Sequence, residues 1–166
     1  MALAQGANTG GNKSGWAESG GTGSDGAASG WVGSRSAAHD MFDRDIASKS
    51  LGIELLGAGD GHAEVRMRVT DEMVNGHAVT HGGFVFILAD TAFACACNSH
   101  GPVTVAAGAD ISFLRQTRAG DVLTAYASER VTHGRSGIYD VTVTCQDDVV
   151  AEFRGRSRAI GAGRPA

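Results

Sequence analysis

The sequence is poor in cysteine and in positive charge, and it has no long apolar run. Among its 166 residues, 14 are Lys or Arg and 18 are Asp or Glu, so the formal net charge is −4. Proteins that bind nucleic acids through general electrostatic attraction are basic, and we therefore expect no nucleic-acid partner. No apolar run reaches the roughly 18 residues that a membrane span needs, so we expect no membrane partner. The N-terminus also lacks the basic and apolar stretches that predict a secretory signal.

The three cysteines, Cys95, Cys97 and Cys145, are an odd number and lack the spacing of a metal site. Free thiols are usual in the reducing cytoplasm, where disulfides are rare. We therefore interpret the cysteines as free thiols of a cytoplasmic protein. We expect neither a metal nor a cofactor.

The first 36 residues differ in composition from those that follow. They are mainly Gly, Ser, Ala, Thr and Asn, and such a segment buries too little apolar surface to offset its ordering entropy. We predict that residues 1–36 and 162–166 are disordered. Trp16 and Trp31 are either docking residues or incidental aromatics of this tail. Residues 37–161 suffice for one domain with one core.

The pattern of this domain predicts a helix, two strands, a long helix and four more strands. Three apolar residues and one lysine recur at helical spacing in the first helix: Met41, Phe42, Ile46 and Lys49. Gly52 can end this helix. The next two strands meet at the turn AGDG, and the second alternates polar residues with Ala63, Val65, Met67 and Val69. Turn residues separate the last four strands, at 103–114, 121–132, 137–146 and 149–160.

This order of elements predicts an α+β architecture. A helix that is apolar nearly all round must be covered on most sides. We expect a curved antiparallel sheet of about six strands that wraps around one long central helix. A second copy of the chain is the economical cover for any face that the sheet leaves open.

One carboxylate interrupts the most apolar part of the sequence. Almost every residue from Phe84 to Cys97 is apolar, except for Asp90 and the adjacent Thr91. Burial of a carboxylate is costly unless a partner compensates for it. Asp90 is therefore either a catalytic group or a structural one that caps a loop or pairs with an arginine.

The residues His81, Gly82 and Gly83 come directly before this apolar helix. A helix N-terminus presents unpaired N–H groups and a partial positive charge, and glycine allows close approach of another molecule. These groups can bind the oxyanion that forms as a thioester carbonyl becomes tetrahedral. The alternative is that the glycines only make the turn into the helix.

Asp90 follows Gly82 by eight residues, which is about 12 Å along a helix. One thioester carbonyl cannot contact both groups on the same helix. If two chains pair with their helices antiparallel, Asp90 of one chain faces the helix N-terminus of the other, and each dimer has two shared sites. Asp90 would then act either as a general base on water or as a nucleophile, and both possibilities remain open.

Four segments carry a family resemblance: NGHAVTHGGFVFILADTAFACACNSHG, ADISFLRQTRAGD, GIYDV and FRGRSRAIG. They resemble the hotdog-fold acyl-CoA thioesterases of the phenylacetic acid degradation (PaaI) type, over about residues 38–161. The sequence departs from the family pattern at Ile87, where a small polar residue is common, and in its long N-terminal tail. The resemblance implies a hotdog fold, hydrolysis of acyl-CoA thioesters, and a homodimer that assembles into a homotetramer.

The resemblance also implies a set of catalytic positions, which are Asn75, His81, Gly82, Asp90 and Thr91. The Asn75 amide can orient the carboxylate or a water molecule. His81 either hydrogen-bonds near the thioester or braces the loop. Thr91 either positions the water or the carboxylate, or bonds to its own preceding turn.

Substrate-binding residues are predicted beside these positions and on the last strand. Gly83 and Phe84 continue the helix start, and the size of the acyl pocket depends on how Phe84, Leu88, Phe93 and the partner chain pack. Alternate positions of a strand share one face, so the last strand carries a stripe of three arginines: Arg154, Arg156 and Arg158. Arg115 and Arg118 lie at a nearby turn. All five can bind the coenzyme A phosphates. The alternative is a solvated strand face that is charged to discourage edge pairing.

Two classes of function remain open. The first is hydrolysis of acyl-CoA thioesters, with aryl-acetyl or hydroxyphenylacetyl groups favoured by the resemblance. The second is a non-catalytic protein that binds acyl thioesters on the same fold, which would not need a carboxylate at Asp90. A hotdog dehydratase is disfavoured because His81 lies ahead of the helix and the surrounding pattern differs.

Overall fold

The computed structural model describes residues 35–160. Two short helices, α1 (Ala37–Phe42) and α2 (Ile46–Ser50), precede the strands β1 (Glu54–Gly59) and β2 (His62–Arg68). A 3₁₀ turn, η1 (Asp71–Met73), leads to the long helix α3 (Gly82–Asn98). The remaining strands are β3 (Thr104–Phe113), β4 (Val122–His133), β5 (Ser136–Cys145) and β6 (Asp148–Ala159).

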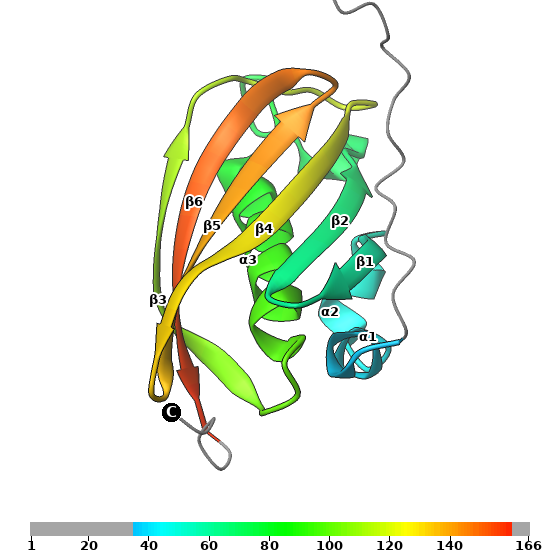
Figure 1. Cartoon of the computed structure of the whole chain (residues 1–166). Coiled ribbons are helices and arrows are strands. Elements are labelled where there is room, and N and C mark those ends of the chain that lie inside the picture. Colours follow the sequence, from blue (N-terminus) through cyan, green and yellow to red (C-terminus); the bar gives the residue numbers. More distant parts are fainter. Residues whose placement is uncertain (1–34, 161–166) are drawn as a thin grey trace, which may run out of the picture.

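The six strands form one antiparallel sheet in the order β1-β2-β4-β5-β6-β3. The sheet curves around α3, and α1 and α2 lie beside β1 (Figure 1). The predicted α+β architecture, a curved antiparallel sheet around one central helix, is therefore confirmed. None of the described helices is both long and apolar enough to cross a membrane.

The strands follow the alternation and the turn residues of the sequence. In β2 and just after it, every second residue is buried, and these are the predicted Ala63, Val65, Met67 and Val69. The preceding turn places Asp60 and Gly61 at φ values of 49° and 78°, a conformation that a two-residue hairpin turn requires and that Gly adopts without strain. The four predicted C-terminal strands are confirmed, each with bounds that differ by about one residue.

The prediction of a single N-terminal helix is wrong, because the chain forms two short helices there. The Asp45 side chain accepts a hydrogen bond from the Ser48 N–H and thereby begins a new helix, α2. Ile46 is consequently 83% exposed instead of packed against the core. Gly52, at φ 69°, follows the end of α2 as predicted.

The predicted tail, residues 1–36, lies outside the described residues except for its last two members. Ser36 is the N-cap of α1, and its hydroxyl donates to the Ala58 carbonyl in β1. Arg35 forms ion pairs with Asp40 and Asp43. Trp16, Trp31 and residues 162–166 lie outside the described part of the chain.

The three cysteines are free thiols, and two of them belong to α3. Cys95 and Cys97 are both buried, and burial raises the pKa of each thiol to about 12. Thiols with such a high pKa are poor nucleophiles at neutral pH, so these two side chains serve as small core residues.

Candidate active site

The N-terminus of α3 is held by its own capping residue. The His81 Nδ1 atom accepts a hydrogen bond from the Gly83 N–H at 3.1 Å, and the Phe84 N–H donates to the His81 carbonyl. The Gly82 N–H, in contrast, has no acceptor within residues 35–160. His81 therefore braces the helix start, and Gly82 is the N–H group that remains available to an incoming oxygen.

The two glycines at this terminus also allow close packing. A Cβ atom at Gly82 would lie 3.0 Å from the Phe113 ring, and one at Gly83 would lie 3.3 Å from His81 Nδ1. Neither glycine has a positive φ. Glycine at these positions thus lets Phe113 of β3 approach the helix start, which is a packing role in addition to any role in binding.

Asp90 lies on the face of α3 that the sheet leaves partly open. This open stripe consists of Gly83, Phe86, Ile87, Asp90 and Ala94, which recur at helical spacing and are less buried than their neighbours. Half-burial of Asp90 raises the pKa of its carboxyl. No residue in the described part of the chain donates a hydrogen bond to Asp90 or forms an ion pair with it. A loop cap or an arginine partner for Asp90 therefore has no support within residues 35–160.

Thr91 connects α3 to α2. Its hydroxyl donates to the Ile87 carbonyl at 2.8 Å and lies 3.0 Å from the Ser48 hydroxyl, which in turn donates to Asp45 at 2.6 Å. Both Ser48 and Thr91 are buried. These contacts support the interpretation that Thr91 bonds to its own preceding turn, and they add a partner, Ser48, that the sequence analysis did not include.

Asn75 shapes the loop before α3. Its side-chain oxygen accepts a hydrogen bond from the His77 N–H at 2.9 Å, and its own backbone N–H donates to the Val79 carbonyl. The amide nitrogen of the side chain has no acceptor among the described residues. Asn75 thus retains two donor hydrogens that can orient a carboxylate or a water molecule.

Comparison with known proteins places this geometry in a family. Residues 77–152 match the thioesterase superfamily. The chain is 48% identical to the acyl-coenzyme A thioesterase PaaI of Escherichia coli over 125 residues, which are 75% of this chain and 89% of that protein. The chain belongs to the PaaI-type thioesterases.

Solved structures agree with this assignment. The structure of the E. coli PaaI protein, from the phenylacetic acid degradation operon, matches with a TM-score of 0.74 at 47% identity and covers 76% of this chain and 93% of its own. A Streptococcus mutans protein bound to acetyl CoA matches with a TM-score of 0.64 at 26% identity, over 68% of this chain and 91% of that one. The hotdog fold expected from the resemblance is thereby confirmed.

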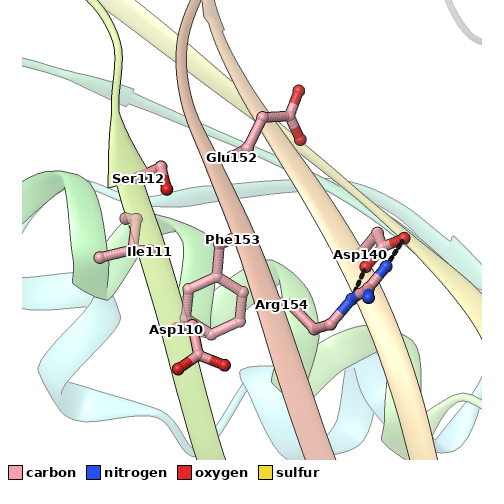
Figure 2. A pocket seen from close by; sticks show the side chains of 7 residues that line it. All are labelled: Asp110, Ile111, Ser112, Asp140, Glu152, Phe153 and Arg154. Atoms are coloured by element: carbon pink, nitrogen blue, oxygen red, sulfur yellow. Dashed lines mark hydrogen bonds and ion pairs between the residues drawn. The ribbon is translucent and has the colours of Figure 1, made fainter.

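The predicted arginine stripe of this PaaI-type chain lies on the outer face of the sheet. Figure 2 shows Arg154 in a bidentate ion pair with Asp140. The Arg154 Nε atom lies 2.6 Å from Asp140 Oδ1, and Nη2 lies 2.8 Å from Oδ2. Arg156 pairs with Asp110 across β3 and β6, and Arg158 donates to the Ser136 hydroxyl. A groove of about 360 Å³ beside Arg154 is also lined by three carboxylates, those of Asp110, Asp140 and Glu152.

These ion pairs support the alternative of a charged, solvated strand face. Arg115 likewise pairs with Asp148. Arg118 differs, because its guanidinium donates to the Ala78 carbonyl in the loop before α3. Like Arg158, it has no carboxylate partner for its guanidinium among residues 35–160. Among the arginines considered for the coenzyme A phosphates, Arg118 is therefore the one whose side chain contacts the loop that leads to α3.

Two residues considered for the acyl pocket are core residues instead. Leu88 and Phe93 are 0% and 1% exposed, so neither can line a surface pocket of this chain. Phe93 packs against Tyr139 and Phe153 on the sheet. Phe84 is only partly buried and lines a groove next to α2.

Asp45 and Ser48, which connect α2 to the helix that carries Asp90, are not among the residues predicted from the sequence. A signal for them was present, since Asp three residues before Ser can cap a helix. No group of His, Cys, Asp and Glu within the described residues could hold a metal ion.

Proposed function

We propose that the protein hydrolyses acyl-CoA thioesters, with Asp90 as the catalytic carboxylate. The observation that carries this proposal is a half-buried carboxylate that has no partner among residues 35–160, on the open stripe of a helix whose first N–H has no acceptor among the same residues. An unpaired carboxylate in such a place costs stability, and enzymes keep such groups for chemistry. Membership of the PaaI-type thioesterases and the acetyl-CoA-bound relative support the choice of substrate.

The site requires two chains because Asp90 and Gly82 are too far apart on one helix. Eight residues of α helix span about 12 Å, whereas both groups must reach one thioester carbonyl. Gly83 and Asp90, seven residues apart, share the open stripe. Two antiparallel copies of α3 that meet along this stripe would place Asp90 of each chain opposite the helix start of the other.

The edge of the sheet supports a second copy of the chain as the partner. Within the described residues β3 pairs with β6 on one side only, and its other side is an edge. Large apolar side chains are exposed on and around this edge, including Val105, Phe113 and Leu114. An exposed apolar edge strand is a template for pairing. Because Phe113 also packs on Gly82, a copy docked there would lie beside the helix start.

The reaction balances without a metal or cofactor. As a general base, the Asp90 carboxylate would take a proton from water while the water oxygen attacks the thioester carbon. The Gly82 N–H of the partner chain would stabilise the oxyanion, after which the C–S bond breaks and the thiolate of CoA takes a proton. As a nucleophile, Asp90 would instead form a mixed anhydride that water then hydrolyses. Both routes need the ionised carboxylate.

The proposed substrates are aryl-acetyl-CoA thioesters, hydroxyphenylacetyl-CoA among them. This choice rests on the relatives from phenylacetic acid degradation. We propose a homodimer as the minimal active form, with a homotetramer implied by the family resemblance. A non-catalytic binder of acyl thioesters is disfavoured, since it would not need an unpaired carboxylate on the open stripe.

The test is a panel of acyl-CoAs with detection of the released thiol. We expect turnover by the wild-type protein, with phenylacetyl-CoA and hydroxyphenylacetyl-CoA among the best substrates. Asp90→Asn should lower kcat by about 10² or more, the usual scale for the loss of a general base. Asp60→Asn is the matched control, because Asp60 lies in the exposed β1-β2 turn at a φ that Asn tolerates. Unchanged turnover by Asp90→Asn would refute the assignment.

A further inference from the structure

The ring of Phe113, the last residue of β3, lies against the first residue of α3. A Cβ atom at Gly82 would lie 3.0 Å from the Cζ atom of Phe113, and 3.3 and 3.4 Å from its two Cε atoms. These three atoms form the far end of the ring, so the tip of the ring points at the Gly82 backbone. Phe113 is nevertheless 53% exposed, which means that much of its side chain contributes nothing to the core of this chain.

The contact requires glycine at position 82. The φ angle of Gly82 is not positive, so the backbone conformation alone gives no reason for glycine there. A Cβ atom 3.0 Å from a ring carbon would be closer than the roughly 3.5–4.0 Å of ordinary contact between carbon atoms. Any other residue at this position would therefore displace the Phe113 ring or the start of the helix.

The ring approaches a residue whose backbone N–H has no acceptor among residues 35–160. The N and Cβ atoms of a residue are bonded to the same Cα atom, so a ring at the Cβ position of Gly82 occupies space beside the N–H that water would otherwise fill. A hydrogen bond to a charged acceptor is stronger where apolar groups replace water, because the local dielectric constant is lower.

We propose that Phe113 is a positioning residue that shields the Gly82 N–H from water and thereby strengthens its hydrogen bond to the oxyanion. The proposal rests on the proposed function, because it assumes that the thioester carbonyl is bound at the helix start. A donor that is already shielded and fixed in place loses little solvation when the negative charge develops. A second copy docked on the edge of β3 would cover the exposed part of the ring and complete the shield.

Truncation of the ring tests its effect on turnover. Phe113→Ala should lower kcat by about tenfold, less than the roughly 10²–10³ for loss of an oxyanion donor, because the N–H itself remains. KM should stay within about twofold, since the oxyanion exists only in the transition state. Phe113→Met should keep most of the wild-type kcat, because its flexible apolar side chain still reaches Gly82.

Tyr126→Ala is the matched control for Phe113→Ala. Tyr126 is also a strand aromatic, 43% exposed, and it lies on the outer face of the sheet because Ala125 and Ala127 beside it are buried. We expect wild-type kcat and KM for Tyr126→Ala. Equal kcat in wild type and Phe113→Ala would overturn the proposal. A raised KM at unchanged kcat would also overturn it, because Phe113 would then be a substrate contact.

A double substitution separates shielding from packing. Gly82→Ala keeps the N–H but presses a Cβ atom against the ring, and Phe113→Ala removes the ring. If the ring shields the N–H, the double variant should have no higher kcat than Phe113→Ala alone. Recovery of wild-type kcat in the double variant would show that the ring only fills space. A circular dichroism melt of each variant shows whether the fold is intact.

Hydrogen exchange tests the shield without any substrate. Because the Gly82 amide has no acceptor within the described residues, its exchange with D₂O reports its access to water. We expect exchange of this amide, followed by NMR in the full chain, to be about tenfold faster in Phe113→Ala than in wild type or Tyr126→Ala. Equal rates would overturn the proposal even if Phe113→Ala lost activity. Slow exchange that depends on Phe113, in a protein that hydrolyses no acyl-CoA, would instead refute the proposed function and keep the shield.

Discussion

The hydroxyl oxygens of Ser48 in α2 and Thr91 in α3 lie 3.0 Å apart in the buried contact between the two helices. Ser48 donates to the Asp45 carboxylate, and Thr91 donates to the Ile87 carbonyl. The network has three contacts, Ser48 to Asp45, Ser48 to Thr91 and Thr91 to Ile87, but the two hydroxyl groups have only two protons. At least one proton is therefore shared between two acceptors or alternates between them. This network fastens α2 to the turn of α3 that carries Asp90.

Removal of either hydroxyl should therefore destabilise the fold. We expect Ser48→Ala and Thr91→Val each to lower the free energy of unfolding by about 1–2 kcal/mol, the usual cost of a lost buried hydrogen bond. Ser50→Ala is the control, because Ser50 is exposed and should stay within about 0.5 kcal/mol of wild type. Urea unfolding measures all three. Identical midpoints for Ser48→Ala and Ser50→Ala would show that the network contributes nothing to stability.

The raised pKa of Asp90 predicts how stability depends on pH. Folded Asp90 holds its proton more tightly than unfolded Asp, whose pKa is about 3.9, so the group favours folding while protonated. This contribution is fully present below the unfolded pKa and is lost as pH rises through the raised folded pKa. Asn mimics the neutral form, and we therefore expect Asp90→Asn to be more stable than wild type at pH 7.

The advantage of Asp90→Asn should shrink as pH falls through the raised folded pKa, and it should vanish below about pH 4, where wild-type Asp90 is neutral in both states. Urea midpoints of both proteins between about pH 4 and pH 7.5 measure this convergence. A variant that is less stable than wild type at pH 7 would indicate that Asp90 is paired in the assembled protein.

The shared site predicts complementation between two inactive variants. Gly82→Pro removes the free N–H at the first position of α3, where proline suits the helix backbone, and should abolish activity. Mixed with Asp90→Asn chains, it should recover part of the activity, because each heterodimer regains one intact site. The readout is thiol release after refolding of the two variants together.

Gly82→Ala separates loss of the N–H from steric effects in this experiment. Alanine keeps the N–H but brings a Cβ atom to 3.0 Å from Phe113, as the proline ring also would. If Gly82→Ala is as inactive as Gly82→Pro, contact with Phe113 and not the N–H is responsible. Folded, demonstrably mixed dimers without activity would place both groups in one chain's site.

The arginines can be ranked by their effect on coenzyme A binding. Arg118→Glu should raise KM for acyl-CoA and leave kcat nearly unchanged, because the phosphates are remote from the scissile bond. The effect should decrease with added salt and be absent with an acyl-N-acetylcysteamine thioester. Arg154→Glu is the comparison, since Arg154 is already paired with Asp140. A larger KM effect at Arg154 than at Arg118 would restore the arginine stripe as the phosphate site.

The effect of an N-terminal deletion should depend on whether it extends past residue 34. Removal of residues 1–34 should leave kcat, KM and Tm nearly unchanged, because their composition provides little apolar surface to pack. Removal of residues 1–36 should lower Tm further, since Ser36 caps α1 and bonds to Ala58. Scanning calorimetry of the two truncated proteins measures this difference in Tm. A clear loss of activity on removal of residues 1–34 would show that the tail docks on the domain.

Local pattern alone was sufficient for most of the elements. The alternation around Val65 predicts the buried face of β2, and the turn at Asp60 and Gly61 predicts its hairpin, because both depend on neighbouring residues. The apolar run around Asp90 likewise predicts a covered central helix with one exceptional carboxylate. The family resemblance added the expected tetramer and substrate, which no local pattern contains.

Only the tertiary structure shows the contacts between residues that are distant in the sequence. Arg154 pairs with Asp140 because the register of β5 and β6 sets them opposite each other, and no spacing within one strand shows this. Phe113 meets Gly82 only because β3 returns along α3, so the packing role of that glycine was hidden. Leu88 and Phe93 are core residues because the sheet curves over their face of the helix. The sequence determines which residues can occupy a face, but only the packed chain determines what lies against that face.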